Sequence, residues 1–262
     1  MKLYKNKDYT VLSEEEMNLY EEVKKTENKG RLRRSNKFRE YPKAARHYKH
    51  LFPNNYLDIV ELGDIGKIND ICNEYQVLLS SNPGEREMLN FINNNEYYLL
   101  IASLFKFYNF GHHGAFLFKE FNIGGHVVDY LLVGKGSGGY EFVFIELEDP
   151  SNPSFMANCH YAESYRKGLN QVRDWKSALN RNFSYLSNEF RRATKPGVAL
   201  PEEFLENDEG RRHYVVIAGR RKHYEVNPRK TYEVRRNESL ARIFHYDNLI
   251  DYTKELIGKK TF

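Results

Sequence analysis

The chain has 262 residues, of which 40% are hydrophobic and 29% charged, so it can bury a core without disulfides or a structural metal. Its 40 basic and 36 acidic residues leave a net charge of +4, so the distribution of charge is more informative than the sum. No apolar run approaches the roughly 18 residues of a membrane-spanning helix, and the polar start is unlike a signal peptide. We therefore expect a cytoplasmic protein without a membrane partner.

The first 80 residues carry few clear patterns. Residues 14–25 have acidic residues first and basic residues last, which predicts a short amphipathic helix with Ser13 as its N-cap. The basic, Asn-rich residues 26–41 predict a loop or an arm. We treat residues 1–80 as a partly helical extension and residues 81–262 as the main domain.

Helices are expected first in the main domain, near residues 82–92 and 96–107. Pro83 is predicted at a first helical position, with Glu85 and Glu87 in the first turn. The periodicity then changes to one typical of strands. Three consecutive strands are predicted, over residues 115–123, 126–133 and 140–147.

A long helix is predicted over residues 162–180 because apolar residues recur at spacings of three and four. These residues are Tyr165, Leu169, Val172, Trp175 and Leu179. A strand is expected at residues 213–218, and residues 243–257 predict an extended segment followed by a helix. The order of elements predicts a mixed α/β domain with a helix packed on a sheet.

Residues 134–139 match G-x-G-x-x-G, but a strand follows them, whereas a dinucleotide site requires a helix. The glycines instead predict a hairpin turn with positive φ angles. A turn centred near Ser137 and Gly138 places Asp129 opposite Glu146. Because strand side chains repeat with period two, Glu148 shares the face of Glu146.

Three converging carboxylates are typical of a site for a divalent cation such as Mg²⁺, which activates water and stabilises charge on a phosphate. The alternative is that Glu146 and Glu148 face solvent at a sheet edge, with Glu148 paired to a lysine. A bulge would change the register by one residue and separate the side chains. The residues alone leave both interpretations open.

Other potential sites are weaker. His112 and His113 are interpreted as a structural pair in a loop, and Cys159 and His160 lack the spaced partners of a zinc site. Cys72 and Cys159 lie far apart, which predicts buried, inert thiols in a reducing compartment. There is no nucleophile elbow and no Walker A motif.

Basic residues gather at 29–39, 211–223 and 229–236, with tyrosines between them. This mixture suits contacts to phosphates and stacking on bases. Solvated surfaces would give the same composition, so this alternative stays open.

Several segments resemble the Shedu family of bacterial anti-phage defence nucleases. They are F-K-E-F-N-I-G-G-H-V-V-D-Y-L-L-V, F-V-F-I-E-L-E-D-P, Q-V-R-D-W, Y-V-V-I-A-G-R-R and F-H-Y-D-N-L, and together the resemblance spans roughly residues 84–257. It implies a restriction-endonuclease-like sheet flanked by helices, with a variant of the PD-(D/E)xK site. By this resemblance Asp129 and Glu146 are metal ligands, Glu120 is an additional acid, and Gln171 is the helix glutamine.

One position departs from the motif, because Glu148 stands where the lysine is usual. Glu148 could be a metal ligand, Lys119 could supply the missing charge, or cleavage could be lost. Our leading hypothesis is a Mg²⁺- or Mn²⁺-dependent endonuclease that cuts DNA. Arg173, Arg220 and Arg221 would then contact phosphates.

Two alternatives belong to other classes of protein. A catalytically decayed nucleic-acid-binding or sensor module would bind in a salt-sensitive way without cutting. An assembly role would use the 20 tyrosines of the chain at a homo-oligomer interface. Since a defence nuclease must be silent before infection, regulation is assigned to residues 1–80, to oligomer assembly or to a partner.

Overall fold

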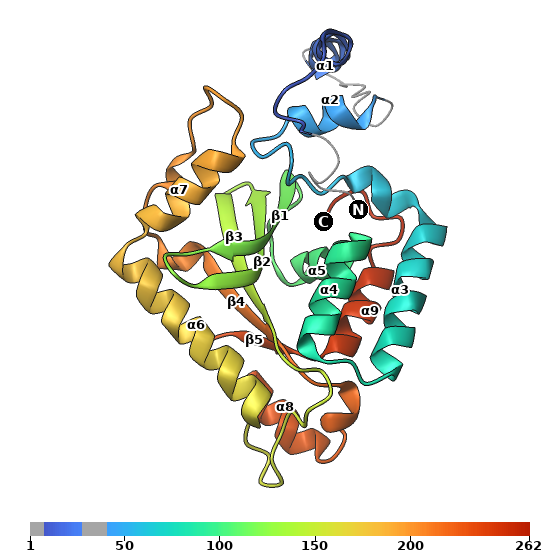
Figure 1. Ribbon diagram of the computed structural model, residues 1–262, viewed down its shortest axis with the longest axis vertical. Coiled ribbons are helices and arrows are strands. Elements are labelled where there is room, and N and C mark those ends of the chain that lie inside the picture. The colour runs from blue at the N-terminus through green and yellow to red at the C-terminus, as the bar shows by residue number, and fades with distance from the viewer. Residues whose placement is uncertain (1–7, 28–40) are drawn as a thin grey trace.

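The computed structural model describes residues 8–27 and 41–262, and these form a mixed α/β fold around one five-stranded sheet (Figure 1). The strand order is β1-β2-β3-β4-β5, with antiparallel pairing from β1 to β3 and parallel pairing from β3 to β5. The mixed α/β fold class expected from the sequence is confirmed. The strands are β1 (Gly114–Asn122), β2 (Val127–Gly136), β3 (Gly139–Leu147), β4 (Arg212–Ile217) and β5 (Arg242–Phe244).

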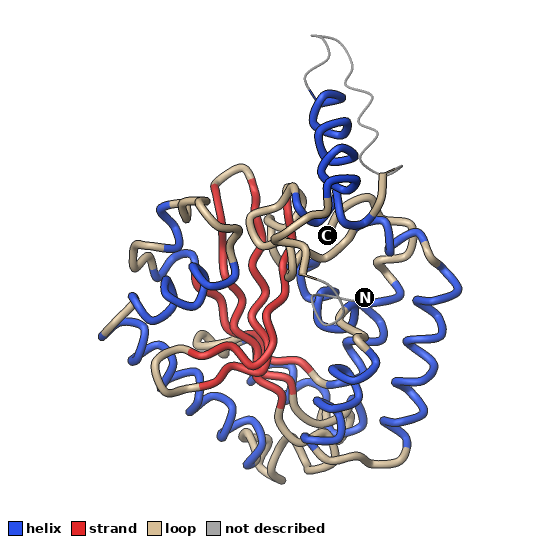
Figure 2. Tube along the Cα trace, turned by 45° about the horizontal axis from the view of Figure 1, so that its top comes forward, coloured by secondary structure: helices blue, strands red, loops and turns tan. Residues whose placement is uncertain are grey.

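Helices cover both faces of the twisted sheet (Figures 1 and 2). One face packs against α3, α4, α5 and α9, and the other against α6 and α7. The α-helices are α1 (Glu14–Glu27), α2 (Lys43–Tyr48), α3 (Ile65–Ser80), α4 (Glu85–Asn95), α5 (Leu99–Ala102), α6 (Glu163–Arg181), α7 (Ser184–Ala193), α8 (Pro228–Arg236) and α9 (Tyr246–Lys254). The 3-10 helices are η2 (Ile59–Gly63), η3 (Ser103–Phe107), η4 (Glu202–Phe204), η5 (Glu209–Arg211) and η6 (Arg221–His223).

The hairpin between β2 and β3 has the predicted register. Gly136 pairs with Gly139 across the turn, and the ladder continues to Tyr130 opposite Ile145. Gly139 adopts the expected positive φ of 102°, which a side chain would disfavour. Gly134 is needed for another reason, since a Cβ there would lie 2.4 Å from the Phe110 ring. The G-x-G-x-x-G pattern therefore reflects a turn and a close contact.

Strands β1 and β2 are irregular at Glu120 and Asp129. At these residues the regular alternation of side chains between the two faces of the sheet is interrupted. Phe118 and Phe121 belong to the same apolar cluster although they are three residues apart, and so do Val128 and Leu131. Glu120 itself has a φ of 47°, and its backbone is not paired in the ladder between its neighbours. The irregularity thus sits at two of the predicted acidic residues.

The N-terminal region is more ordered than the sequence suggested. The helix over residues 14–25 is confirmed as α1, and Ser13 caps it by accepting a bond from the Glu16 N–H. The proposed arm falls largely on residues 28–40, outside the described residues. Helix α3 was not predicted, although its buried Ile68, Ile71, Cys72, Tyr75 and Leu79 follow a helical spacing.

Two expected helices differ in their bounds. Helix α4 begins at Glu85 after Gly84 as N-cap, so Pro83 lies outside the helix and the predicted first-turn position was wrong. The single helix expected near residues 96–107 is divided between α5 and η3. It begins only at Leu99, because Glu96 adopts the left-handed conformation that ends α4.

The burial of the two cysteines follows the expectation. Cys72 and Cys159 are both buried free thiols. Among these residues we find no helix long and apolar enough to cross a membrane.

Candidate active site

The acidic residues gather where β3 ends, next to α6. Glu146 pairs in register with Val216 of β4, so it lies on the middle strand of the sheet, and only 5% of the residue is exposed. Glu148 is still more buried, at 2% exposure. The solvent-facing alternative for these two side chains is therefore wrong.

Helix α6 reaches this end of the sheet because residue 168 is glycine. A Cβ on Gly168 would lie 2.6 Å from Val216 and 3.2 Å from the Cγ of Glu148. The missing side chain lets the helix backbone approach β4 closely. It thereby brings the polar residues of α6 over Glu148.

Asp129 is held against the end of β3. The backbone N–H of Leu147 donates to its Oδ2 over 2.8 Å, just beyond the last ladder pair of the hairpin. Glu120 is exposed on β1, between Lys119 and Phe121, which pair with the two neighbours of Asp129. Burial is the main cause of the raised pKa of Asp129, and the charge of Glu120 adds to it. Glu120 and Glu146, on the two neighbouring strands, thus lie within electrostatic reach of Asp129.

The carboxylates perturb one another strongly. Burial, followed by the charges of Asp129 and Glu148, raises the pKa of Glu146 from 4.5 to about 10. Burial raises the pKa of Asp129 to about 6, although the hydrogen bond from the Leu147 N–H opposes the rise. Burial also raises the pKa of Glu148 to about 7, against the opposing effect of Lys167. Such a set resists full ionisation unless a cation compensates it.

Three side-chain oxygens at this site have no hydrogen-bond partner among the described residues. They are Oε2 of Glu146, Oε1 of Glu148 and Oε1 of Gln171, and all three atoms are buried. Buried polar atoms are normally satisfied, so each of these acceptors lacks the donor or cation that burial usually requires.

Lys167 of α6 contacts this cluster, and the sequence did not single it out. Its Nζ lies 2.9 Å from Oε2 of Glu148 and 3.2 Å from Oε2 of Glu85 on α4. The alternative that Glu148 pairs with a lysine is correct, and that lysine is Lys167. Its spacing of four residues before Gln171 on α6 was the available signal. The separate hypothesis that Lys119 supplies the missing charge stays a prediction.

The donor atoms fit a hard divalent cation, since they are carboxylate oxygens with unpaired lone pairs. The described residues nevertheless contain no group of three or more His, Cys, Asp or Glu side chains arranged to hold a metal ion. Mg²⁺ usually keeps several waters and takes only one or two carboxylates. Asp129 and Glu146 are the pair that would meet this requirement.

The three predicted phosphate-binding arginines are placed differently from one another. Arg220 donates from Nε and Nη2 to the Asp247 carboxylate, so its guanidinium is held within the fold. Arg221 forms an ion pair with Asp251 at the surface. Arg173 is exposed on α6, where it contacts only the nearby Asn170 side chain among the described residues.

The comparisons with known proteins identify the family of the segment that carries these residues. The chain matches the family model described as "Shedu protein SduA, C-terminal" over residues 82–250. A search of curated proteins gave no match. The matched segment includes β1, β2, β3 and α6, and hence Glu120, Asp129, Glu146, Lys167 and Gln171. Because this match spans more than half of the sequence, the chain belongs to the Shedu family through its SduA C-terminal domain.

Proposed function

We propose that the protein is a Mg²⁺- or Mn²⁺-dependent endonuclease that hydrolyses DNA phosphodiester bonds in anti-phage defence. The observation that carries the proposal is Glu146, a buried carboxyl with an unpaired oxygen and a pKa near 10, beside Asp129. A carboxylate kept in this state is costly for folding, and such perturbed groups concentrate at functional sites. Membership of the Shedu family supports the same conclusion.

The residues divide the work according to their positions. Asp129 and Glu146 would hold the cation, with the exposed Glu120 on the neighbouring strand β1. A bound cation supplies a more acidic water and charge stabilisation for the phosphate. Lys167 brings a positive charge to the site, and Glu148 fixes its position through the 2.9 Å ion pair.

Gln171 lies one turn beyond Lys167 on the same helix, and its unpaired Oε1 can accept a hydrogen bond from a water molecule or the substrate. Together the two α6 residues supply the charge and the orienting group that the motif lysine would otherwise provide. This arrangement explains how Glu148 can occupy the lysine position without loss of the positive charge.

A second candidate function is a nucleic-acid-binding or sensor module that no longer cuts. It is favoured by one observation, namely that Lys167 is already shared between Glu148 and Glu85. DNA is the proposed partner in both cases, and a homo-oligomer is proposed as the assembly. The sensor predicts binding that weakens steeply with salt and no cleavage with any metal.

The deciding experiment measures cleavage of linear and supercoiled DNA in Mg²⁺, Mn²⁺ or EDTA. Native protein should cut only with metal, and Glu146→Gln should abolish cutting. Glu141→Gln is the matched control, because Glu141 lies on the same strand but contacts His213 at 2.7 Å, away from the site. Tight DNA binding by the native protein without cleavage would instead establish the sensor module.

A further inference from the structure

A cavity of about 690 Å³ lies at the opposite end of the parallel strands from the carboxylates. It opens where β4 and β5 begin, whereas Glu146 lies where β3 ends. None of the acidic site residues lines it. Its size is within the range of small-molecule sites, about 300 to 1,000 Å³.

Positive charge dominates the lining. Five basic side chains, Lys176, Arg212, Arg235, Arg236 and Arg242, face two acidic ones, Glu209 and Glu238. The Glu238 carboxylate accepts a bond from the Leu240 N–H, and that of Glu209 lies 3.6 Å from Arg212. Within the described chain, the other four basic side chains form no ion pair with a carboxylate.

Arg212 is the second, independent sign of a ligand. Its side chain is only 1% exposed, yet its Nε and Nη1 have no hydrogen-bond partner among the described residues. Only Nη2 is engaged, by Asn180 at 2.8 Å. The neighbouring Tyr214 hydroxyl is also buried and unpaired. A buried guanidinium with free donors is costly, and an anion bound in the cavity would compensate its charge.

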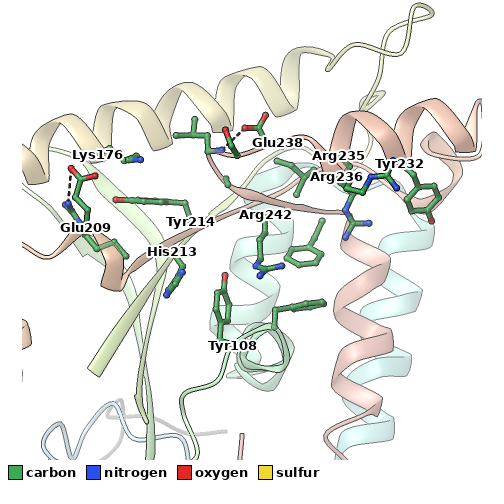
Figure 3. Close-up of a pocket in the computed structure, with 17 residues that line it drawn as sticks. Tyr108, Lys176, Glu209, His213, Tyr214, Tyr232, Arg235, Arg236, Glu238 and Arg242 are labelled. Carbon is green, nitrogen blue, oxygen red and sulfur yellow. Dashed lines mark hydrogen bonds and ion pairs between the residues drawn. The ribbon is translucent and has the colours of Figure 1, made fainter. Parts of the chain in front are cut away.

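Aromatic rings line the same cavity. Figure 3 shows Tyr232 beside Arg235 and Arg236 at one end, Lys176 and Glu209 at the other, and Arg242 between the two ends. Tyr232 is 52% exposed, so its ring offers a free surface for stacking. The cavity thus combines an aromatic platform at one end with cationic groups along its length.

We infer that this cavity binds a nucleoside phosphate, with its base on Tyr232 and its phosphates directed to Arg242, Arg212 and Lys176. A nucleoside phosphate carries both the planar ring and the extended anionic chain that the lining matches. Inorganic phosphate would leave the aromatic end unused. The inference concerns ligand binding and does not depend on DNA cleavage.

The test is calorimetric titration of the full chain with ATP in EDTA, where metal-dependent cleavage plays no part. ATP should bind saturably, whereas adenosine and inorganic tripolyphosphate should each bind about tenfold more weakly or not at all. Arg242→Ala and Arg236→Ala should each weaken ATP binding by about tenfold. Both arginines are exposed, so these variants should fold.

Arg229→Ala is the matched control, since Arg229 lies exposed on the same helix as Arg236 but outside the cavity. It should leave ATP binding unchanged. The proposal is overturned if ATP gives no saturable binding, or if Arg229→Ala weakens binding as much as Arg242→Ala. Binding of a single-stranded oligonucleotide but of no mononucleotide would also overturn it, in favour of a nucleic-acid groove.

Discussion

A positive charge near Glu148 comes from another element of the fold, the helix α6 that carries Lys167. Glu148 is on the strand end where the motif has a lysine, and Lys167 reaches it from α6. Burial lowers the pKa of Lys167, but the hydrogen bond and charge of Glu148 outweigh this and keep it above its ordinary value. The ammonium therefore stays charged throughout the neutral range.

Replacing Lys167 by methionine should reduce DNA cleavage by about a hundredfold, as for the loss of one charge-stabilising donor. Stability should fall by only about 1 kcal/mol, because the ammonium is half exposed. Arg166→Met is the control, since Arg166 lies next in sequence but pairs with Glu163 in solvent. Cleavage rates at saturating metal would decide, and an unchanged rate in Lys167→Met would remove Lys167 from the site.

The raised pKa of Glu146 makes a prediction about stability and pH in EDTA. A carboxyl whose pKa is higher in the folded state binds its proton more tightly there, so its contribution to stability is present at low pH. That contribution is lost as pH rises from 4.5, the ordinary value, towards about 10. Glu146→Gln has no such proton to lose.

The variant should therefore be more stable than the native protein at pH 8, by roughly 2 to 4 kcal/mol. The difference should shrink as pH falls below 4.5, where the carboxyl becomes protonated in the unfolded as well as the folded state. Thermal unfolding across this pH range measures it. Adding Mg²⁺ at pH 8 should stabilise the native protein more than the variant, and equal responses of the two proteins would count against metal binding at Glu146.

At the scale of elements, the close packing of α6 on β4 depends on Gly168. In an exposed helix, glycine to alanine stabilises by about 1 kcal/mol. Here the added Cβ would meet Val216 at 2.6 Å, so the helix must shift. We expect Gly168→Ala to destabilise the fold by about 1 to 3 kcal/mol and to slow cleavage by displacing Lys167. Denaturant unfolding should show the lower free energy of unfolding. Asn170→Ala, at an exposed position of α6, is the control. A Gly168→Ala protein that is more stable than the native one would contradict the close packing of α6 on β4.

Sequence reasoning succeeded where the determining interactions are local. The register that places Asp129 opposite Glu146 follows from a two-residue turn and strand alternation, and the structure has that register up to Tyr130 and Ile145. It failed where partners come from distant elements. Arg220 lies in a basic run and looked available to phosphates, but it pairs with Asp247, 27 residues away. No local sequence pattern indicates that the charge of Arg220 is paired within the fold.

At the scale of the whole molecule, residues before 81 share a core with the end of the chain. Helix α3 packs against α9, and its buried Tyr75 and Leu79 belong to the same apolar cluster as Leu249. The Leu79 carbonyl also accepts a hydrogen bond from Arg220. The residues assigned to an extension therefore include a helix that covers one face of the sheet.

Because α3 is part of the core, removing residues 1–80 and removing residues 1–40 should have different effects. Removing residues 1–80 deletes α3 and uncovers buried apolar residues of the α9 face, so we expect loss of cooperative unfolding and of cleavage. Removing residues 1–40 leaves α3 in place and should preserve a cooperative transition, and it should raise cleavage if that segment restrains the site. Thermal unfolding and DNA cleavage should be measured on both proteins. A cooperatively folding protein that lacks residues 1–80 would mean that α3 is dispensable, and the nuclease domain would then be independent of everything that precedes it.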